Sequence, residues 1–182
     1  LSSENERIAL RDRVAGEHPD LNVLVNNAGI QQWMKVDDDD FYARAKAELA
    51  INIEAPVHLA QLFMALPQLK TIMNVSSGLA FSPLAKTPVY SATKAFIRSF
   101  TLSLRHLLKE RGIEVIEIIP PALNTDLGGK GLHDQAPPVS AFLDAIFPQL
   151  EAGRDEVAFA FSEDRLNAWP ELYKTSFARL NP

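Results

Sequence analysis

Residues 113–119 read Ile-Glu-Val-Ile-Glu-Ile-Ile, and this stretch decides the fold class. Its nearly continuous apolar character is typical of a strand in a parallel sheet that is covered on both faces. Shorter apolar runs occur at residues 21–25, 71–75 and 156–161. The four runs predict four strands, each separated from the next by a segment long enough for a helix.

Helical patterns fill the segments around these strands. They are expected over residues 2–17, 41–66 (in one or two pieces), 90–111, 140–153 and around 169–177. In the helix over 90–111, one apolar stripe contains Phe96, Phe100, Leu104, Leu107 and Leu108, and Gly112 marks its end. Strands that alternate with helices imply right-handed crossovers and a parallel sheet. The expected fold class is therefore α/β, with a doubly wound parallel sheet in three layers.

Composition limits the classes of partner. The 182 residues carry a formal net charge of -5, which argues against a nucleic-acid partner because such partners need a dense cationic surface. The sequence contains no cysteine, so it forms no disulfide and uses no thiolate. No stretch approaches the roughly 20 apolar residues of a membrane span, and the start does not read as a signal peptide. We expect a single cytoplasmic domain over residues 1–182, with no membrane partner.

Two features raise the question of a metal site. Residues 37–40 are four consecutive aspartates directly before Phe41. A metal site is one interpretation, but a helix N-terminus, where the helix dipole favours carboxylates, is the favoured one. His58 and His106 lie on predicted helices without a matching ligand pair. We therefore expect no metal.

The ends of the predicted strands indicate where a ligand binds. In parallel α/β sheets, ligands bind outside the carboxyl ends of the strands. Residues 26–29, 76–78 and 120–125 directly follow the first three predicted strands. These three segments are the candidate site.

The clearest chemical signal is Tyr-Ser-Ala-Thr-Lys, which places Tyr90 and Lys94 one turn apart on one helix face. An ammonium near a phenol lowers the pKa of the phenol and allows acid–base chemistry near neutral pH. By itself, such a pair is more often chance or surface packing. Ser77 lies 13 residues upstream of Tyr90, where its hydroxyl either orients a carbonyl oxygen or, with Ser76, caps a loop.

Together, four motifs resemble those of the short-chain dehydrogenase/reductase family. They are Asn-Asn-Ala-Gly at 26–29, Asn-Val-Ser-Ser-Gly at 74–78, the Tyr90 and Lys94 pair, and Thr125 after the third strand. Their order and spacing match the family from about residue 20 to residue 125. The resemblance implies a Rossmann-like fold, NAD or NADP as cofactor, and the interconversion of a small-molecule carbonyl and a secondary alcohol.

The resemblance also implies a role for each site residue. Tyr90 is the proton donor or acceptor, and Lys94 lowers the pKa of Tyr90 and binds the nicotinamide ribose. Ser77 orients the substrate oxygen, and Asn52 holds a water that links the lysine to solvent. Without the resemblance, Asn52 is interpreted as an ordinary helix amide. The implied cofactor-binding residues are Asn26, Ala28, Gly29, Tyr90, Lys94, Pro120 and Thr125.

Assembly follows from the same resemblance. It implies a homodimer or homotetramer built partly from the helices at 41–65 and 90–111. Both helices carry apolar residues over a wider arc than one sheet face needs. Examples are Leu59, Leu62, Phe63, Leu102 and Leu107.

Two departures from the family pattern stand out. The family usually has Pro-Gly at this point, but here Pro120 is followed by Pro121. In this respect the chain resembles a bacterial branch of the family, named for the D-alanyl-lipoteichoic acid operon, that also has Pro-Pro. The glycine-rich turn that opens the family fold does not occur, so we expect the chain to be N-terminally incomplete and to bind the dinucleotide weakly by itself. The glycines at 128–131 lie instead in a predicted substrate lid over residues 122–140.

Two functions from different classes follow. The first is an NAD(P)-dependent oxidoreductase, which the four catalytic residue types favour. The alternative is a truncated or non-catalytic Rossmann-like relative that no longer holds the dinucleotide, which the missing turn favours.

Overall fold

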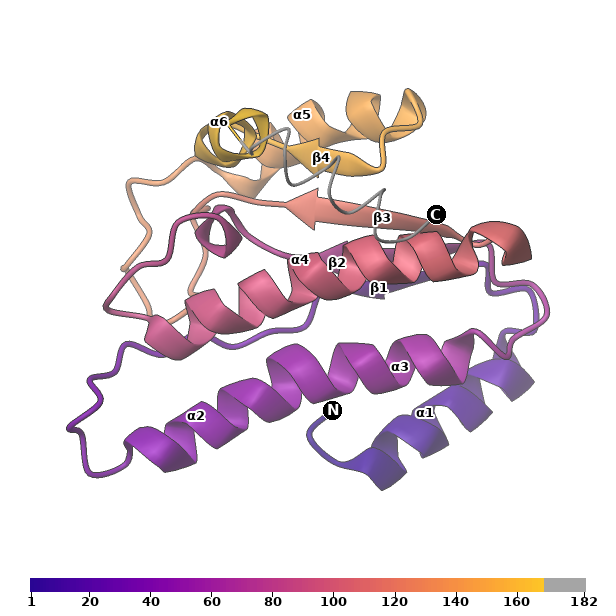
Figure 1. Cartoon of the computed structure of the whole chain (residues 1–182), viewed down its shortest axis with the longest axis horizontal. Coiled ribbons are helices and arrows are strands. Elements are labelled where there is room, and N and C mark those ends of the chain that lie inside the picture. The colour runs from indigo at the N-terminus through magenta and orange to yellow at the C-terminus, as the bar shows by residue number, and fades with distance from the viewer. Residues whose placement is uncertain (169–182) are drawn as a thin grey trace.

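A four-stranded parallel sheet forms the centre of the protein (Figure 1). The computed structural model describes residues 1–168 and confirms the predicted α/β class. The strands are β1 (Val23–Asn26), β2 (Thr71–Val75), β3 (Glu114–Ile119) and β4 (Glu156–Ala158), in the spatial order β1-β2-β3-β4. All neighbouring strands pair in parallel, so their carboxyl ends lie along one edge of the sheet.

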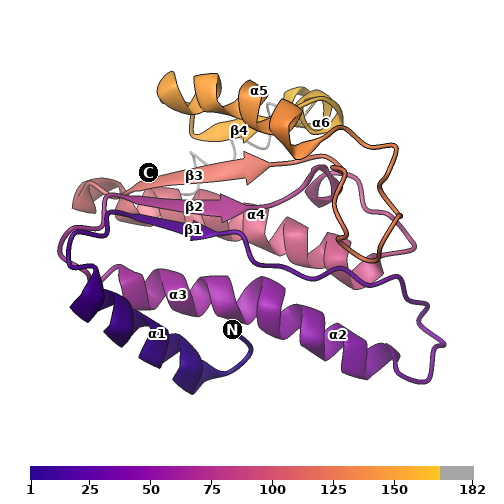
Figure 2. The ribbon, with the colours of Figure 1, turned by 180° about the vertical axis from the view of Figure 1, so that it is seen from behind.

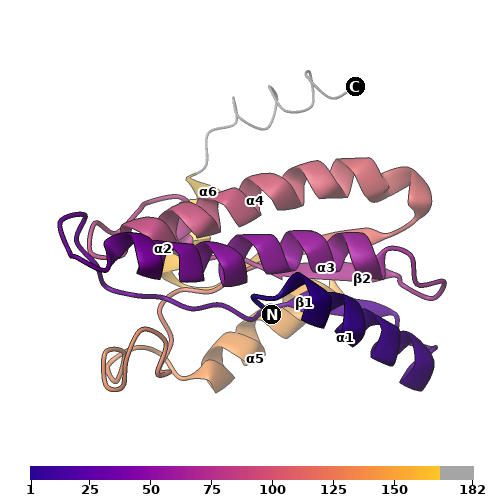
Figure 3. The same cartoon turned by 90° about the horizontal axis from the view of Figure 1, so that it is seen from below.

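Helices cover both faces of this sheet, which gives three layers (Figures 2 and 3). On one side lie α1 (Glu4–Glu17), α2 (Phe41–Leu49), α3 (Ala55–Phe63) and α4 (Pro88–Leu108), and on the other lies α5 (Val139–Glu151). Shorter pieces are η1 (Ala50–Glu54), η2 (Gly78–Ala80), η3 (Lys109–Arg111) and α6 (Phe161–Asn167). Across residues 1–168, no helix has the length and apolar character that crossing a membrane requires.

Two apolar clusters hold the layers together. The first lies between α3, α4 and the sheet, and it includes Phe63, Ile72 and Val115. The second lies beneath α5 and includes Ile118 and Phe142. Residues of β3 contribute to both clusters, because successive side chains of a strand point to opposite faces. This explains the nearly continuous apolar run from which the fold class was predicted.

Capping residues define several helix ends. The Ser3 hydroxyl accepts a hydrogen bond of 3.4 Å from the N–H of Glu6 at the start of α1. Gly112, with a φ of 67°, ends the helical segment after α4, as predicted. Helix α2 begins at Phe41, directly after the four aspartates, which supports their interpretation as a helix N-terminus.

Two predictions about the C-terminal part differ from the structure or fall outside it. The last strand ends at Ala158, not at residue 161, because Ala160 has a φ of 49° that turns the chain out of the sheet. Helix α6, which the sequence pattern did not predict, begins at Phe161. The helix predicted around 169–177 lies outside the described residues.

The apolar stripe predicted for α4 is only partly correct. Leu104 and Leu108 are buried, but Phe96 is 42% exposed and Leu107 is 70% exposed. Toward the N-terminus of α4, the buried face of the helix is mainly polar. It comprises Tyr90, Ser91, Thr93, Lys94, Ile97, Arg98 and Thr101. Leu59 and Phe63 of α3, which we expected at a subunit contact, are core residues. The buried face of α4 is therefore mainly polar toward the N-terminus of the helix and apolar toward its C-terminus.

The two pieces of the long helix are joined by a single π turn, η1, which contains Asn52 (Figure 3). Pro56 has no N–H to donate to the carbonyl of Asn52, so the α-helical bond at that point cannot form. The N–H of Ala55 donates instead to the carbonyl of Ala50, five residues earlier. Such π turns are frequent at functional sites.

Candidate active site

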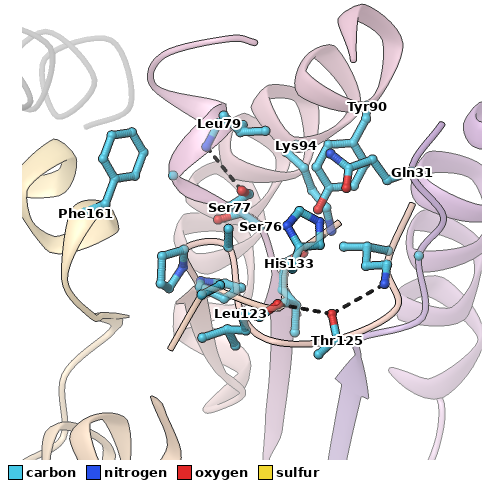
Figure 4. A pocket seen from close by; sticks show the side chains of 18 of the residues that line it. Gln31, Ser76, Ser77, Leu79, Tyr90, Lys94, Leu123, Thr125, His133 and Phe161 are labelled. Atoms are coloured by element: carbon cyan, nitrogen blue, oxygen red, sulfur yellow. Dashed lines mark hydrogen bonds between the residues drawn. The ribbon is translucent and has the colours of Figure 1, made fainter. Parts of the chain in front are cut away.

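One cavity, of about 740 Å³, lies at the carboxyl ends of β1, β2 and β3 (Figure 4). Residues that follow each strand, and residues of the loop between β3 and α5, line it. The predicted site residues in its lining are Ala28, Gly29, Ser77, Tyr90, Lys94, Pro120 and Thr125. Two others, Asn26 and Asn52, lie behind the lining.

Tyr90 and Lys94 are brought together by α4 and face the cavity (Figure 4). Both side chains are buried. The Nζ atom of Lys94 lies over the Tyr90 ring, 5.4 Å from its centroid, and donates a hydrogen bond of 2.8 Å to the carbonyl oxygen of Val75. The end of β2 therefore fixes the ammonium beside the phenol.

The acid–base character of this pair differs from the expectation. Burial raises the pKa of Tyr90 to about 12; a hydrogen bond with Ser77 opposes this shift and the charge of Glu48 adds to it. Burial lowers the pKa of Lys94 to about 8. Desolvation therefore sets the direction of the Tyr90 pKa. That Lys94 lowers this pKa stays a prediction.

Ser77 serves in one of the two ways that its sequence position suggested, as a cap, and its contact with Tyr90 leaves the other open. Its Oγ accepts a hydrogen bond of 3.1 Å from the N–H of Leu79 and so caps η2. The same hydroxyl group interacts with Tyr90. The two hydroxyl groups therefore border one space, in which a carbonyl oxygen can receive hydrogen bonds from both.

Asn52 acts on the loop after β1. Its Nδ2 donates to the carbonyl oxygen of Ile30 at 2.8 Å, and its Oδ1 accepts from the N–H of Ile30 at 2.9 Å. A Cβ at Gly29 would lie 3.3 Å from Asn52 Oδ1 and 3.7 Å from Lys94 Nζ. Glycine at this position therefore lets the loop lie against both side chains.

Asn26 lies outside the cavity and ties elements together. Its Nδ2 donates to Asn74 Oδ1 at 2.9 Å, and Asn74 Nδ2 donates to Thr101 Oγ1 at 3.0 Å. This chain of side chains links β1, β2 and α4. A direct cofactor contact by Asn26 is not supported by its position; Asn27, the next residue, lines the cavity instead.

The predicted lid contributes one wall. Within residues 122–140, the cavity is lined by Ala122, Leu123, Thr125, Leu127, His133, Ala136 and Pro137. The N–H of Asn124 donates to the carbonyl of Pro137 at 2.9 Å, which closes the base of the loop. The glycines at 128, 129 and 131 all have a positive φ, so they shape its turns.

Three polar groups at the site were not predicted as functional. Gln31 and His133 point into the cavity near Tyr90 (Figure 4). Glu48, on α2, is fully buried; its Oε1 accepts a hydrogen bond of 2.6 Å from the N–H of Gln32, and its Oε2 has no partner. Arg44, one turn earlier, donates to the carbonyl of Trp33. The only sequence signal was the four-residue spacing of positions 44, 48 and 52.

The burial of Glu48 gives a prediction about pH and stability. Burial raises its pKa from 4.5 to about 7, so between these values the folded protein keeps a proton that the unfolded chain loses. Stability contributed by this site therefore falls as pH rises from about 4.5 to about 7. Glu48→Gln should raise the free energy of unfolding at pH 8 by about 2 kcal/mol, after allowance for solvent screening, and change little at pH 4.5.

Urea denaturation between pH 4.5 and pH 8 measures this effect. The matched control is Glu54→Gln, because Glu54 is an exposed carboxylate at the end of the adjoining π turn η1. If the gain in free energy of unfolding of Glu48→Gln over wild type does not grow with pH, the pKa of Glu48 is not raised in the folded protein.

The cavity lining contains groups that could hold the nicotinamide riboside part of a dinucleotide. Tyr90 and Lys94 supply polar groups for a ribose, Gly29 leaves space beside them, and Pro120 gives an apolar wall. In the part of the chain that the structure describes, no group of three or more His, Asp or Glu side chains could hold a metal ion.

Comparison with a family model gives an independent result. The model described as short chain dehydrogenase matches residues 1–136, which contain all of the predicted catalytic residues. The match therefore covers both the strand ends and the helix that build the cavity.

Comparisons with individual proteins agree with the family match. The chain is 37% identical to the uncharacterized oxidoreductase DltE of Bacillus subtilis, over 100% of this chain and 75% of that protein. A short chain dehydrogenase from Burkholderia cenocepacia in complex with NADP is 26% identical, with a TM-score of 0.78, over 99% of this chain and 79% of that one. A second such complex from the same organism is 29% identical, with a TM-score of 0.65, over 74% and 56%. Of several further curated relatives, the chain spans only 21% to 56%.

Proposed function

Because the chain belongs to the short-chain dehydrogenase family, we propose that it interconverts a carbonyl compound and a secondary alcohol with NAD or NADP. The observation that carries this proposal is the convergence of Ser77, Tyr90 and Lys94 on one cavity at the ends of the strands. The solved relatives that hold NADP support a nicotinamide cofactor.

Each residue has a chemical task in this proposal. The Ser77 hydroxyl donates a hydrogen bond to the carbonyl oxygen, and the Tyr90 hydroxyl gives the proton that completes the alcohol. Lys94, fixed by the Val75 carbonyl, binds the nicotinamide ribose beside Tyr90. The nicotinamide, when bound, supplies the hydride in reduction and accepts it in oxidation. Asn52 fixes the loop at Ile30 and orders water behind Lys94.

The raised pKa of Tyr90 suits carbonyl reduction. A phenol whose pKa is about 12 stays protonated at neutral pH and is ready to donate. Oxidation requires the phenolate, so it becomes effective only at higher pH or when bound groups lower this pKa. The burial of the site therefore favours the donor form of Tyr90.

Assembly as a homodimer or homotetramer through α2, α3 and α4 remains part of the proposal. Leu107 of α4 and Leu49 of α2 are exposed apolar residues on these helices, which supports it. Light scattering at micromolar concentration measures the assembly directly.

The enzymatic proposal is tested with the full chain, NADH or NADPH, and a panel of aliphatic and aromatic ketones and aldehydes. We expect loss of nucleotide absorbance with one alcohol formed per nucleotide oxidised. If no carbonyl is reduced and neither nucleotide raises the melting temperature, the alternative that no longer holds the dinucleotide is correct and the proposal is wrong.

A further inference from the structure

A buried ionic cluster lies directly behind the cavity and has no task in the proposed chemistry. Arg98 Nη1 lies 2.5 Å from Glu117 Oε2 and 2.7 Å from Glu156 Oε1. The Ser76 hydroxyl donates a hydrogen bond of 2.5 Å to Glu117 Oε1. Ser76, Arg98 and Glu117 are almost completely buried. We call the five residues Ser76, Phe81, Arg98, Glu117 and Glu156 the Arg98 cluster.

Stability is a weak reason for such a cluster. Burying two charges carries a large desolvation cost, and well-packed apolar residues of similar volume often give equal or greater stability. An apolar pair between α4 and β3 would therefore hold the layers at least as well. The position of the cluster gives a different reason for its presence.

The cluster fixes both ends of the segment that carries Ser77. At one end, Ser76 is bound by Glu117 through its side chain, and its N–H donates to the carbonyl of Ile118 at 2.9 Å. At the other end, the Arg98 guanidinium lies over the Phe81 ring, 4.3 Å from its centroid. Residues 76–81 are therefore held from both sides by one group of side chains.

The same cluster connects this segment to the elements that carry the other proposed catalytic side chains. Arg98 lies on α4 one turn after Lys94 and two turns after Tyr90. Glu117 belongs to β3, next to β2, which is followed by Ser77. The position of Ser77 relative to Tyr90 and Lys94 is thus set by a buried connection between β2, β3 and α4.

We propose that Ser76, Glu117 and Arg98 are positioning residues that hold the Ser77 hydroxyl at the correct distance from Tyr90. This inference rests on the proposed function, because it assigns a role in that reaction. A reacting group that is displaced by about 1 Å can lose about 100-fold in rate, so a rigid connection matters for turnover. Glu117 and Arg98 lie outside the cavity lining, and Ser76, which is part of the lining, is bound by Glu117; in this proposal all three act through Ser77.

Ser76→Ala is the sharpest test, because it removes one hydroxyl and leaves the ion pair in place. In the full chain, kcat for carbonyl reduction should fall about tenfold, as expected for the loss of one hydrogen bond to a charged group. KM and the nucleotide Kd should stay within about twofold. Ser77→Ala should lower kcat further, and Ser76→Ala should add nothing in that background, because its effect passes through Ser77.

The control is Ser103→Ala, since Ser103 is an exposed serine of α4 whose hydroxyl donates to the carbonyl of Ser99. It should leave kcat unchanged. Multiplicative losses in the Ser76→Ala/Ser77→Ala double variant would overturn the proposal, and so would an unchanged kcat in Ser76→Ala.

A second measurement separates this inference from the proposed function. Amide hydrogen exchange of residues 78–81 should be about tenfold faster in Ser76→Ala, while the exchange of α4 stays as in wild type. A wild-type chain that reduces no carbonyl would refute the proposed function. The exchange result would still show whether Ser76 holds the segment that carries Ser77. Unchanged exchange at 78–81 would refute the inference whether or not the chain is active.

Discussion

Tyr90→Phe should reduce carbonyl reduction by about 1,000-fold or more, because the ring stays in place and only the transferable proton is lost. Tyr90 is buried in the cavity, and its hydroxyl interacts with that of Ser77. Nucleotide affinity should stay nearly unchanged, because the Lys94 contact with Val75 does not involve the Tyr90 hydroxyl. Steady-state kinetics and calorimetric titration with NADH and NADPH measure the two quantities.

The chain contains its own control for this experiment. Tyr42 and Lys46 on α2 have the same four-residue spacing, and Lys46 Nζ lies 5.8 Å from the centroid of the Tyr42 ring. Tyr42 is 73% exposed and does not line the cavity. Tyr42→Phe should therefore leave kcat unchanged. Turnover of Tyr90→Phe within about tenfold of wild type would show that another group donates the proton.

Lys94→Met should reduce both turnover and nucleotide affinity. Methionine fills much of the space of the lysine chain, so the substitution removes mainly the charge. Loss of a charge-assisted hydrogen bond should raise the nucleotide Kd by about 10- to 100-fold. The ammonium beside the Tyr90 phenol is lost as well, so kcat/KM should fall by about 1,000-fold. The Val75 carbonyl also loses its side-chain partner.

Lys46→Met is the matched control, because it makes the same chemical change in the exposed pair. Circular dichroism and thermal unfolding show whether the Lys94→Met chain folds. If Lys94→Met lowers kcat but binds nucleotide as well as wild type, Lys94 has no role in holding the ribose.

The two Tyr-x-x-x-Lys pairs explain how much of the site could be predicted from the sequence. The spacing is equal in both, so spacing alone does not distinguish Tyr90 from Tyr42. The surrounding segments made the distinction: Ser77 follows a predicted strand, and residues 26–29 follow another. Because the ends of parallel strands meet at one edge, these distant segments were expected to converge, and the cavity lies where they do.

What sequence reasoning missed depends on tertiary burial. Glu48 on a helix is an ordinary surface residue by its pattern, and only the loop packed over it makes it a buried carboxyl. The same holds for the pKa of Tyr90, whose direction is set by desolvation. At residues 156–161 the apolar alternation predicted a longer strand, but the backbone of Ala160 ends it and places Phe161 on the cavity wall.

The π turn between α2 and α3 changes the rotational phase of one long helical rod. Glu48 in α2 and Asn52 in the π turn itself bind the loop after β1, and after the turn, Leu59 and Phe63 face the core. One inserted residue rotates the two parts by about 100° relative to each other, so a single rod presents a polar row to the loop and an apolar row to the sheet. A redesign that deletes one residue to make this rod regular would turn the polar row away. In this protein, the more regular helix would be the one that separates Glu48 and Asn52 from the loop after β1.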